Sequence, residues 1–363
     1  MVFTSVIISI IIVSSSPLVT PNFTHLRIGV DWLIMTAKPV KVDIKAIVLL
    51  IILCASWGLQ QISIKIAVQS IAPALQGGIR SIGAAILLYL WMVARREKIV
   101  LNDGTFWWGM AVGLFFSIEF LLIYWGLEFT SASRSVIFLY TMPFFTAMGA
   151  HWFVPGEALG RAQFAGLCCA FLGIVTAFSE SIGKPQSLML IGDTMLLLAA
   201  VFWAAATIMV KASPLSRIRA SHVLLYQLVV SAVVLPLGAA LLGQTEITHT
   251  TPLILGCIAY QIIWVAFITY LAWFWLIRNY PASKLSAFLF LTPLFGVLEG
   301  IILLDEQITY RLLAALAMVF PIMGYFPFNG HMPVVLALTL VFGFAIAAVS
   351  YALVESPCRE ALL

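Results

Sequence analysis

Long apolar runs dominate the pattern of this chain. Along most of its 363 residues, stretches of about 20 apolar residues alternate with short polar joins. A stretch of this length crosses the hydrocarbon core of a bilayer as a helix, and the lack of strict alternation argues against barrel strands. The pattern predicts an all-α integral membrane protein with ten transmembrane helices, near 45–67, 73–94, 105–127, 132–154, 160–179, 188–211, 220–242, 252–276, 282–304 and 308–326.

Composition leads to the same class. Charged residues make up 9% and hydrophobic residues 63% of the chain, against roughly 25% and 45–50% in soluble domains. Such a chain cannot cover its core with polar surface, so lipid must be its solvent. The five cysteines are an odd number, and four of them fall inside predicted spans, where we interpret them as small core residues: Cys54, Cys168, Cys169 and Cys257.

The basic residues predict the orientation of the helices. If the first span begins in the cytoplasm, most basic residues near the joins lie there too: Lys38, Lys41, Lys45, Arg95, Arg96, Lys98, Arg161, Lys211, Arg217, Arg219, Arg278 and Lys284. The opposite joins hold mainly Arg134, Lys184 and Arg311. Because cytoplasmic loops carry an excess of Lys and Arg, we predict a multi-pass protein of the cell (inner) membrane with the N-terminus of helix 1 cytoplasmic.

Two stretches of the chain repeat each other. Residues 124–166 and 274–315 match at one offset, 282 − 132 = 150, shown by Ala132 and Ala282, Ser133 and Ser283, Phe138 and Phe288, and Pro143 and Pro293. A repeat of this kind indicates two copies of one structural unit. Each copy holds five predicted spans, an odd number, so the second copy must be inverted relative to the first. Inverted repeats are typical of alternating-access secondary transporters.

The repeat divides the chain into four parts. Residues 45–180 form the first predicted copy (helices 1–5) and residues 188–326 the second (helices 6–10). Residues 1–44 are interpreted as an N-terminal extension and cytoplasmic lead-in, with Met35 a more ordinary start for a multispanning protein. Residues 327–363 hold an eleventh apolar run, near 332–354, and predict an appended C-terminal helix with a tail.

Several short motifs occur in the same order in both copies. The first copy has Ser56-Trp57-Gly58 with Lys65, then Arg80, then Ala132-Ser133 leading to Pro143 and Glu157. The second has Trp203 with Lys211, then Ala282-Ser283 leading to Pro293 and Glu306. On these motifs, residues 45–326 resemble the EamA family of the drug/metabolite transporter superfamily. The resemblance implies ten spans in two inverted five-helix repeats, a central cavity surrounded by four helices of each repeat, and export of amino acids or other small metabolites.

The closing segment resembles a different family. Ser350 to Leu362 is similar to the end of the acyltransferase-3 membrane proteins, over a region without catalytic residues. This leaves a membrane-bound acyltransferase-like protein as an alternative to a transporter. A non-transporting membrane scaffold is a further alternative, which the polar residues inside the spans argue against.

Ionisable residues inside apolar spans are the first candidates for function, because they are costly in lipid. Glu119, in the third span, can bind a substrate amine or carry a coupling proton, or it can be a structural partner of Arg80. Thr269 is its counterpart in the second copy. Arg80 can hold a substrate carboxylate in a bidentate contact, although a structural ion pair is favoured slightly. Asp193 is interpreted as a carboxylate that complements a helix dipole.

Other residues of the spans are weaker candidates for substrate binding or coupling. Lys65 closes its helix and is more simply explained by reaching the interface, and His151 by hydrogen bonding in the core. Glu299 fits either a structural or a coupling role. Pro143 and Pro293 are expected to loosen or kink their helices and to serve gating. Aromatic residues that can stack on a planar substrate include Trp57, Tyr124, Tyr140 and Trp203.

The sequence also limits the partners to expect. It contains no G-x-x-x-x-G-K-[ST] phosphate loop and no His/Cys cluster with metal-ligand spacing. We therefore expect no enzyme activity, no cofactor, no metal and no nucleic-acid binding. The expected partners are a small-molecule substrate and the lipid bilayer, with a homodimer left open beside a monomer.

Overall fold

A computed structural model describes residues 43–98, 104–154 and 188–304 except 283–284 and 286–287, with runs of one to three residues between 160 and 176, and residue 310. Within these residues all regular structure is helical, apart from an isolated bridge between Ile71 and Ile247. The expected spans near 308–326 and 332–354, most of the one near 160–179, the N-terminal extension and the tail lie outside the described residues.

Seven helical segments of the described part are long and apolar enough to cross a membrane. They are α2 (Ile44–Ala67), α3 (Pro73–Ala94), α4 (Phe106–Phe129), the pair α5 (Ala132–Leu139) and α6 (Met142–Phe153), α8 (Met189–Ala212), α9 (Ala220–Leu241), and the series α10 (Pro252–Ala259), η2 (Tyr260–Thr269) and α11 (Tyr270–Asn279). A short 3₁₀ turn, η1 (Pro214–Arg217), joins α8 to α9. The ends predicted for these seven segments agree to within about three residues, because backbone hydrogen bonding inside lipid has to be completed within each segment.

Local sequence signals account for several helix starts. The Asp43 carboxylate accepts a 3.0 Å hydrogen bond from the Ala46 N–H and caps α2. The Ser131 hydroxyl caps α5 by accepting a hydrogen bond from the Arg134 N–H, and the Thr251 hydroxyl caps α10 by accepting one from the Ile254 N–H. Pro73 lies in the first turn of α3, where its missing N–H costs nothing.

Helices four and nine of the predicted series are interrupted at their prolines. α5 ends at Leu139 and α6 begins at Met142, with Pro143 in its first turn. In the second copy the 3₁₀ turn η3 (Leu289–Leu291) leads into α13 (Thr292–Leu304), whose second residue is Pro293. Proline cannot donate the backbone bond that would continue the preceding helix, so a break rather than a gentle kink forms at these places.

One feature of the eighth span was not predicted. Ten residues, Tyr260–Thr269, form the π-helix η2 between α10 and α11. π-helical segments are rare and frequently occur at functional sites. No proline or glycine run in this stretch signals the change of helix type.

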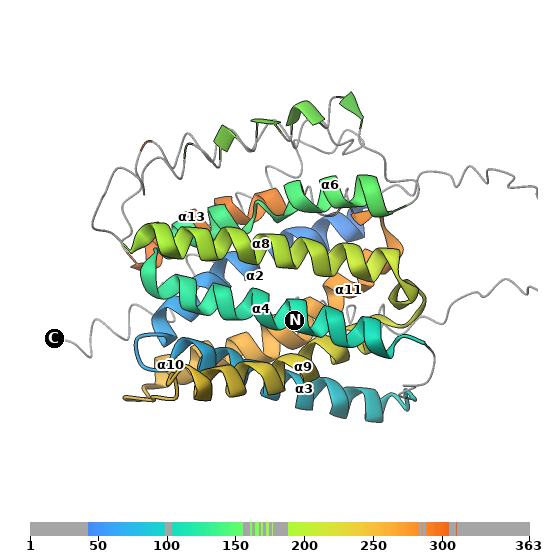
Figure 1. The fold of residues 1–363 in the computed structure, drawn as a ribbon. Helices are drawn as coiled ribbons and strands as arrows, with labels where there is room; N and C mark the ends of the chain where they lie inside the picture. The colour runs from blue at the N-terminus through green and yellow to red at the C-terminus, as the bar shows by residue number, and fades with distance from the viewer. Residues whose placement is uncertain are drawn as a thin grey trace, which may run out of the picture.

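The helices lie side by side along roughly one direction, with α6 and α13 at one side of the bundle and α3, α9 and α10 at the other (Figure 1). α4 packs extensively on α8, α3 on α9, and α2 on α13. α5 and α6 in turn pack on α8. The first helix of each predicted copy therefore packs against the fourth helix of the other copy, with the most buried span, α2, inside the bundle.

Close approach of α4 and α8 depends on two glycines. A Cβ atom on Gly192 would lie 2.8 Å from the Gly126 carbonyl oxygen, and one on Gly126 would lie 3.2 Å from the Gly192 carbonyl oxygen. Only glycine fits such a crossing, which brings the neighbouring Asp193 within reach of α5.

Candidate functional site

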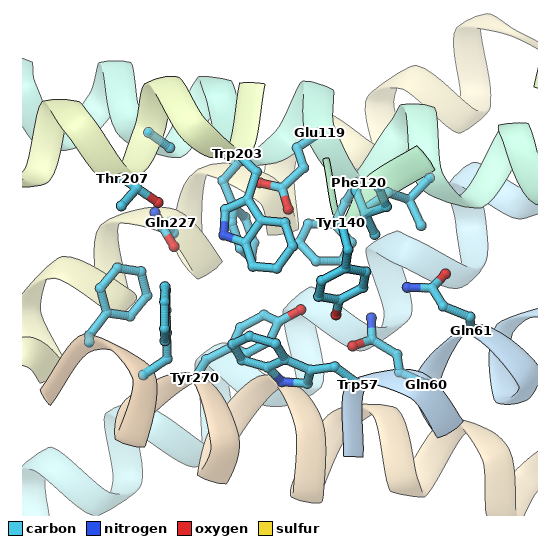
Figure 2. A pocket seen from close by; sticks show the side chains of 16 residues that line it. Trp57, Gln60, Gln61, Glu119, Phe120, Tyr140, Trp203, Thr207, Gln227 and Tyr270 are labelled. Atoms are coloured by element: carbon cyan, nitrogen blue, oxygen red, sulfur yellow. The ribbon is translucent and has the colours of Figure 1, made fainter. Parts of the chain in front are cut away.

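A small cavity lies in the middle of the bundle, where the two predicted copies meet (Figure 2). It encloses about 30 Å³, room for roughly two water molecules, and is well below the size of a typical ligand pocket. Residues of α2, α4 and the α5 end line one part: Trp57, Gln60, Gln61, Phe116, Glu119, Phe120, Ile123, Leu139 and Tyr140. Residues of α8, α9 and α11 line the rest: Trp203, Ala206, Thr207, Gln227, Tyr270, Trp273 and Phe274.

Aromatic rings form most of the cavity wall. The Trp57 ring meets the rings of Trp203, Tyr270 and Trp273 edge to face, with centroids 5.6, 5.9 and 5.5 Å apart. Tyr140 meets Trp203 in the same way at 5.4 Å. Edge-to-face packing fixes these rings relative to one another. Trp57 and Trp203, which the sequence places at matching positions of the two copies, are thus in direct contact.

The Trp57 side chain is held by a hydrogen bond to a residue outside the cavity lining. Its indole N–H donates a 2.8 Å hydrogen bond to the Thr269 hydroxyl, which donates to the Val265 carbonyl at 2.7 Å. Thr269 is buried and does not line the cavity. Its role is therefore to orient Trp57.

Glu119 points from α4 into the cavity (Figure 2). Its side chain is almost fully buried, and its Oε2 atom has no hydrogen-bond partner among the described residues. The amide oxygen of Gln227, another lining residue, is also without a partner there. The cavity thus presents acceptor oxygens to a ligand that brings hydrogen-bond donors.

Arg80 lies behind the cavity wall in a cage of four aromatic rings. Its guanidinium carbon is 3.6 Å from the Phe120 ring centroid and 5.6–5.8 Å from those of Phe116, Tyr124 and Tyr270. The side chain is fully buried, and one nitrogen reaches the Tyr270 hydroxyl at 3.5 Å. Cation–π attraction supports a charge in such a cage.

No direct ion pair joins Arg80 to Glu119 among the described residues, although the two side chains are close enough for an electrostatic interaction. The Arg80 Nε and Nη2 atoms have no hydrogen-bond partner in this part of the chain. Three rings of the cage, those of Phe116, Phe120 and Tyr270, also line the cavity. These three rings therefore border both the guanidinium and the cavity.

Lys65 lies in the last turn of α2, outside the cavity lining. Its ammonium group donates to the carbonyl oxygens of Leu127 and Thr130 at 2.6 and 2.8 Å, and so caps α4. Lys211 donates to the Tyr280 carbonyl at 2.8 Å, directly after α11. These contacts fit a structural role for both lysines.

Three further candidates also lie outside the cavity lining. Tyr124 is buried in the Arg80 cage and donates a 2.7 Å hydrogen bond to Gln261 Oε1. Glu299 is buried where α13 meets α2. His151 is exposed on the last turn of α6 rather than buried in the core.

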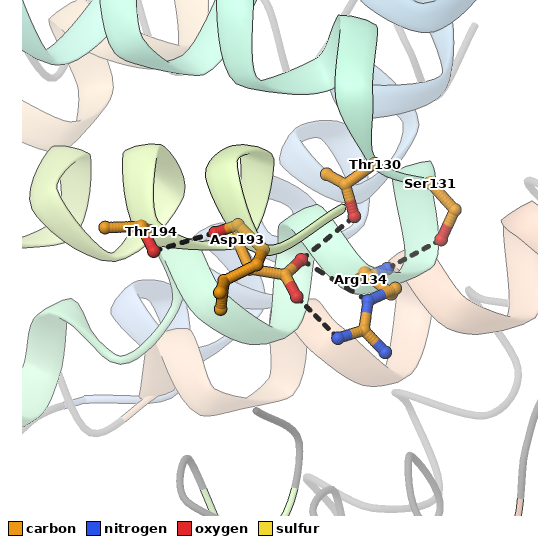
Figure 3. A network of polar contacts seen from close by, with 6 residues as sticks. Thr130, Ser131, Arg134, Asp193 and Thr194 are labelled. Carbon is orange, nitrogen blue, oxygen red and sulfur yellow. Dashed lines mark hydrogen bonds and ion pairs between the residues drawn. The ribbon is translucent and has the colours of Figure 1, made fainter. Parts of the chain in front are cut away.

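Asp193 has a more specific role than the expected dipole contact. Its carboxylate pairs with Arg134 of α5, with Oδ2 and Nη2 2.5 Å apart, and accepts a 2.9 Å hydrogen bond from the Thr130 hydroxyl (Figure 3). Both side chains of the ion pair are buried. The pair ties the start of the fourth span of one copy to the first span of the other.

A second cavity, of about 70 Å³, lies between the end of α8, η1, the start of α9 and α11. Lys211 and Arg278 contribute to its lining. Phe274 lines both cavities. The Phe274 ring therefore lies at the boundary of both cavities.

Sequence reasoning missed the neutral polar residues of the central cavity. Gln60, Gln61, Thr207 and Gln227 all line it. A glutamine is unusual in an apolar span because its amide needs partners, so scanning the spans for glutamine would have found three of the four.

Comparison with known proteins decides the class of this molecule. The family model of the EamA-like transporter family matches the chain twice, over residues 44–179 and 190–326. The chain belongs to the EamA-like transporter family. It is a membrane transporter rather than an enzyme, which removes the acyltransferase and scaffold alternatives.

Relatives with printed names agree with this assignment. The chain is 24% identical to an uncharacterized transporter, YoaV, of Bacillus subtilis, over 71% of this chain and 88% of the relative. It is 25% identical to a probable amino-acid metabolite efflux pump of Escherichia coli, over 72% of this chain and 88% of the relative. A protein of known crystal structure is similar in fold, with a TM-score of 0.58 and 17% identity over 76% of this chain and 94% of that chain.

Proposed function

We propose that this EamA-family transporter is a secondary carrier that exports a small zwitterionic metabolite, an amino acid or a related amphipathic compound, by alternating access. The observation that carries the proposal is the central cavity, which both halves of the chain line and into which the buried Glu119 points. A site at the seam of two repeats near the bilayer midplane is where alternating-access carriers bind their substrates.

Repeated contacts support two inverted five-helix units, with domain limits near 45–180 and 188–326 and ten spans in all. Lys65 donates to the Thr130 carbonyl and Lys211 to the Tyr280 carbonyl. Thr130 and Tyr280 differ by the repeat offset of 150 residues. Equivalent lysines thus contact the ends of equivalent helices in the two units, as expected for two copies of one fold.

The basic residues support a cytoplasmic start of α2 in the inner membrane. Arg219, before α9, donates to Glu97 at 2.9 Å, and Ser221 donates to the same carboxylate at 2.6 Å. The joins after α3 and before α9 therefore lie at one end of the bundle. Both are rich in Lys and Arg, as cytoplasmic loops are.

The chemistry of the cavity favours a zwitterion. A substrate ammonium group can donate to Glu119 and to the Gln227 amide oxygen, both of which have acceptor atoms without partners in the described residues. If the Phe120 ring turns aside, the Arg80 guanidinium comes within reach of a substrate carboxylate. The aromatic wall suits the apolar part of such a molecule, and one relative is named a probable amino-acid metabolite efflux pump.

The second cavity supports entry from the cytoplasm. Its lining includes Lys211 and Arg278, whose charges attract a carboxylate, and Phe274 separates it from the central cavity. We infer that Phe274 is the inner gate. The breaks at Pro143 and Pro293 lie in the fourth helix of each unit and provide places where these helices can bend.

Reconstitution tests the proposal. The purified protein in liposomes is assayed for uptake of radiolabelled amino acids, with and without an imposed proton gradient. Each positive amino acid is then compared with its decarboxylated amine and with the acid that lacks the amino group. Uptake of a zwitterion, strongly reduced for both truncated analogues, is the expected result. Equal transport of the amine alone, or no uptake beyond empty liposomes for the whole panel, would contradict the proposal.

A further inference from the structure

A second buried carboxyl group lies outside the substrate cavity. Glu299, on α13, is fully buried, and neither of its oxygens has a hydrogen-bond partner among the described residues. It is absent from the lining of both cavities. A charged carboxylate without a partner is energetically costly in such a place, so this residue is a candidate for function.

The surroundings of Glu299 leave no space. A Cβ atom on Gly58 of α2 would lie 2.7 Å from Glu299 Oε2 and 2.8 Å from the Gly296 backbone nitrogen. A Cβ atom on Gly296 would in turn lie 2.6 Å from a methyl group of Val136 on α5. The carboxyl group is thus enclosed at a tight crossing of α2 and α13 and shielded from water.

The charged groups of the elements around Glu299 are engaged elsewhere. Lys65 of α2 caps α4, and Arg134 of α5 pairs with Asp193. The Cys54 thiol of α2 points to the Phe288 carbonyl. Tyr260, the first residue of the π-helix η2, lies within electrostatic range of Glu299, and its hydroxyl donates to the Ser56 carbonyl at 2.8 Å.

Neighbouring residues of α2 connect this crossing to the substrate cavity. Trp57 lines the cavity, while Gly58 touches Glu299. The Ser56 hydroxyl accepts a 2.8 Å hydrogen bond from the Trp264 indole of η2. A displacement of α2 that opens the cavity at Trp57 therefore also loosens the enclosure of Glu299.

We propose that Glu299 is the proton-coupling site of this transporter, separate from the substrate-binding residue Glu119; the inference rests on the transport function proposed above. In the packing described here the group is a carboxylic acid, because an unpaired carboxylate in this dry enclosure would be too costly. When α2 and α13 separate on one side, water enters and the O–H bond breaks. The proton passes to water, and the electron pair remains on the carboxylate.

The return step completes the cycle. The carboxylate cannot re-enter the enclosure beside Gly58 until it takes up a proton, which comes from the other side of the membrane. One proton then moves in for each substrate that moves out. Because the same helix carries Trp57 and Gly58, neither movement proceeds without the other.

The test compares coupled and uncoupled transport in liposomes that contain a pH-sensitive dye. Glu299→Gln is expected to keep substrate counterflow, which needs no net proton movement, within about twofold of the wild type. It is expected to lose accumulation driven by a proton gradient, and substrate-dependent proton flux, by about tenfold or more. Glu128→Gln, on the exposed side of α4, serves as the control that changes neither.

The outcomes separate this inference from the proposed function. No transport by the wild type contradicts the proposed function itself. Proton-coupled transport that persists in Glu299→Gln overturns the assignment of Glu299 as the proton site, and so does accumulation driven by a sodium gradient without proton flux.

If Glu299→Gln does not fold, the wild type is treated with dicyclohexylcarbodiimide, which reacts with protonated carboxyl groups in apolar surroundings. Labelling of the Glu299 peptide that falls as pH rises supports the inference, and absence of labelling at every pH overturns it.

Discussion

The indole N–H of Trp57 donates a hydrogen bond of 2.8 Å to the Thr269 hydroxyl, across 212 positions of the chain. Thr269 follows Glu119 by the repeat offset of 150 residues. Trp203, the counterpart of Trp57, shares the cavity wall with Glu119. The second copy thus places a hydrogen-bonded threonine behind the tryptophan of the first copy, while the first copy places a carboxyl group in the cavity. This asymmetry supports the proposal that Glu119 contacts the substrate.

Replacement of Glu119 by glutamine is expected to impair transport without unfolding the protein. Glutamine keeps the shape of the side chain and removes its charge, so binding of a substrate ammonium group weakens. We expect transport in liposomes to fall at least about tenfold, equivalent to about 1.4 kcal/mol. Glu128→Gln on the same helix is the matched control, since Glu128 is exposed. Near-normal transport by Glu119→Gln would leave Glu119 a structural residue.

Truncation of Phe274 is expected to connect the two cavities. Its ring borders both, so Phe274→Ala removes the barrier between Thr207 and the basic end of the bundle. In a background with the native cysteines replaced by serine, we expect Thr207→Cys to react with a hydrophilic thiol reagent about tenfold faster when Phe274 is alanine. Phe153→Ala, at an exposed position of α6, provides the control. Unchanged labelling would show that access to the cavity follows another route.

The Arg134–Asp193 pair is expected to contribute to stability rather than to transport. Removing one partner leaves a buried charge, so Arg134→Met should lower the free energy of unfolding by about 3–5 kcal/mol. Adding Asp193→Leu should recover much of this loss, because the remaining charge disappears. Denaturant titration in mixed micelles measures both effects.

The Arg219–Glu97 pair after α3 supplies the comparison for that experiment. The Arg219 side chain is 59% exposed and the Glu97 side chain 3% exposed, and Glu97 keeps the hydrogen bond from Ser221 when Arg219 is removed. Arg219→Met should therefore cost clearly less than Arg134→Met, whose partner is left as a buried charge. Equal losses for Arg134→Met and Arg219→Met would mean that burial does not determine the strength of these pairs.

Lys65 is expected to act on the stability of α4. Lys65→Met leaves the carbonyl groups of Leu127 and Thr130 without this donor, which should lower the free energy of unfolding by about 1–3 kcal/mol. The apparent KM for substrate should stay the same in the folded fraction. A raised KM with unchanged stability would instead indicate that Lys65 contacts the substrate.

The sequence by itself determined the class and the seven spans that the structure describes, and it predicted the repeat. A helix in lipid has to complete its own backbone hydrogen bonds, so the information for each span is local and can be read from about 20 apolar residues. For the same reason α2, α3 and α9 begin and end close to their predicted positions. The repeat indicated that a site should be sought between the two copies, and Trp57 and Trp203 meet in the central cavity.

Only the tertiary structure decided which polar residues share the cavity. Glu119 points into it, Arg80 lies behind the Phe120 ring, and Glu299 is enclosed beside Gly58. The apolar pattern cannot distinguish these places, because a membrane helix is apolar on its lipid-facing side and on its packed side alike. The direction in which each side chain points is set by contacts between segments far apart in the chain, such as the glycine crossing of α2 and α13.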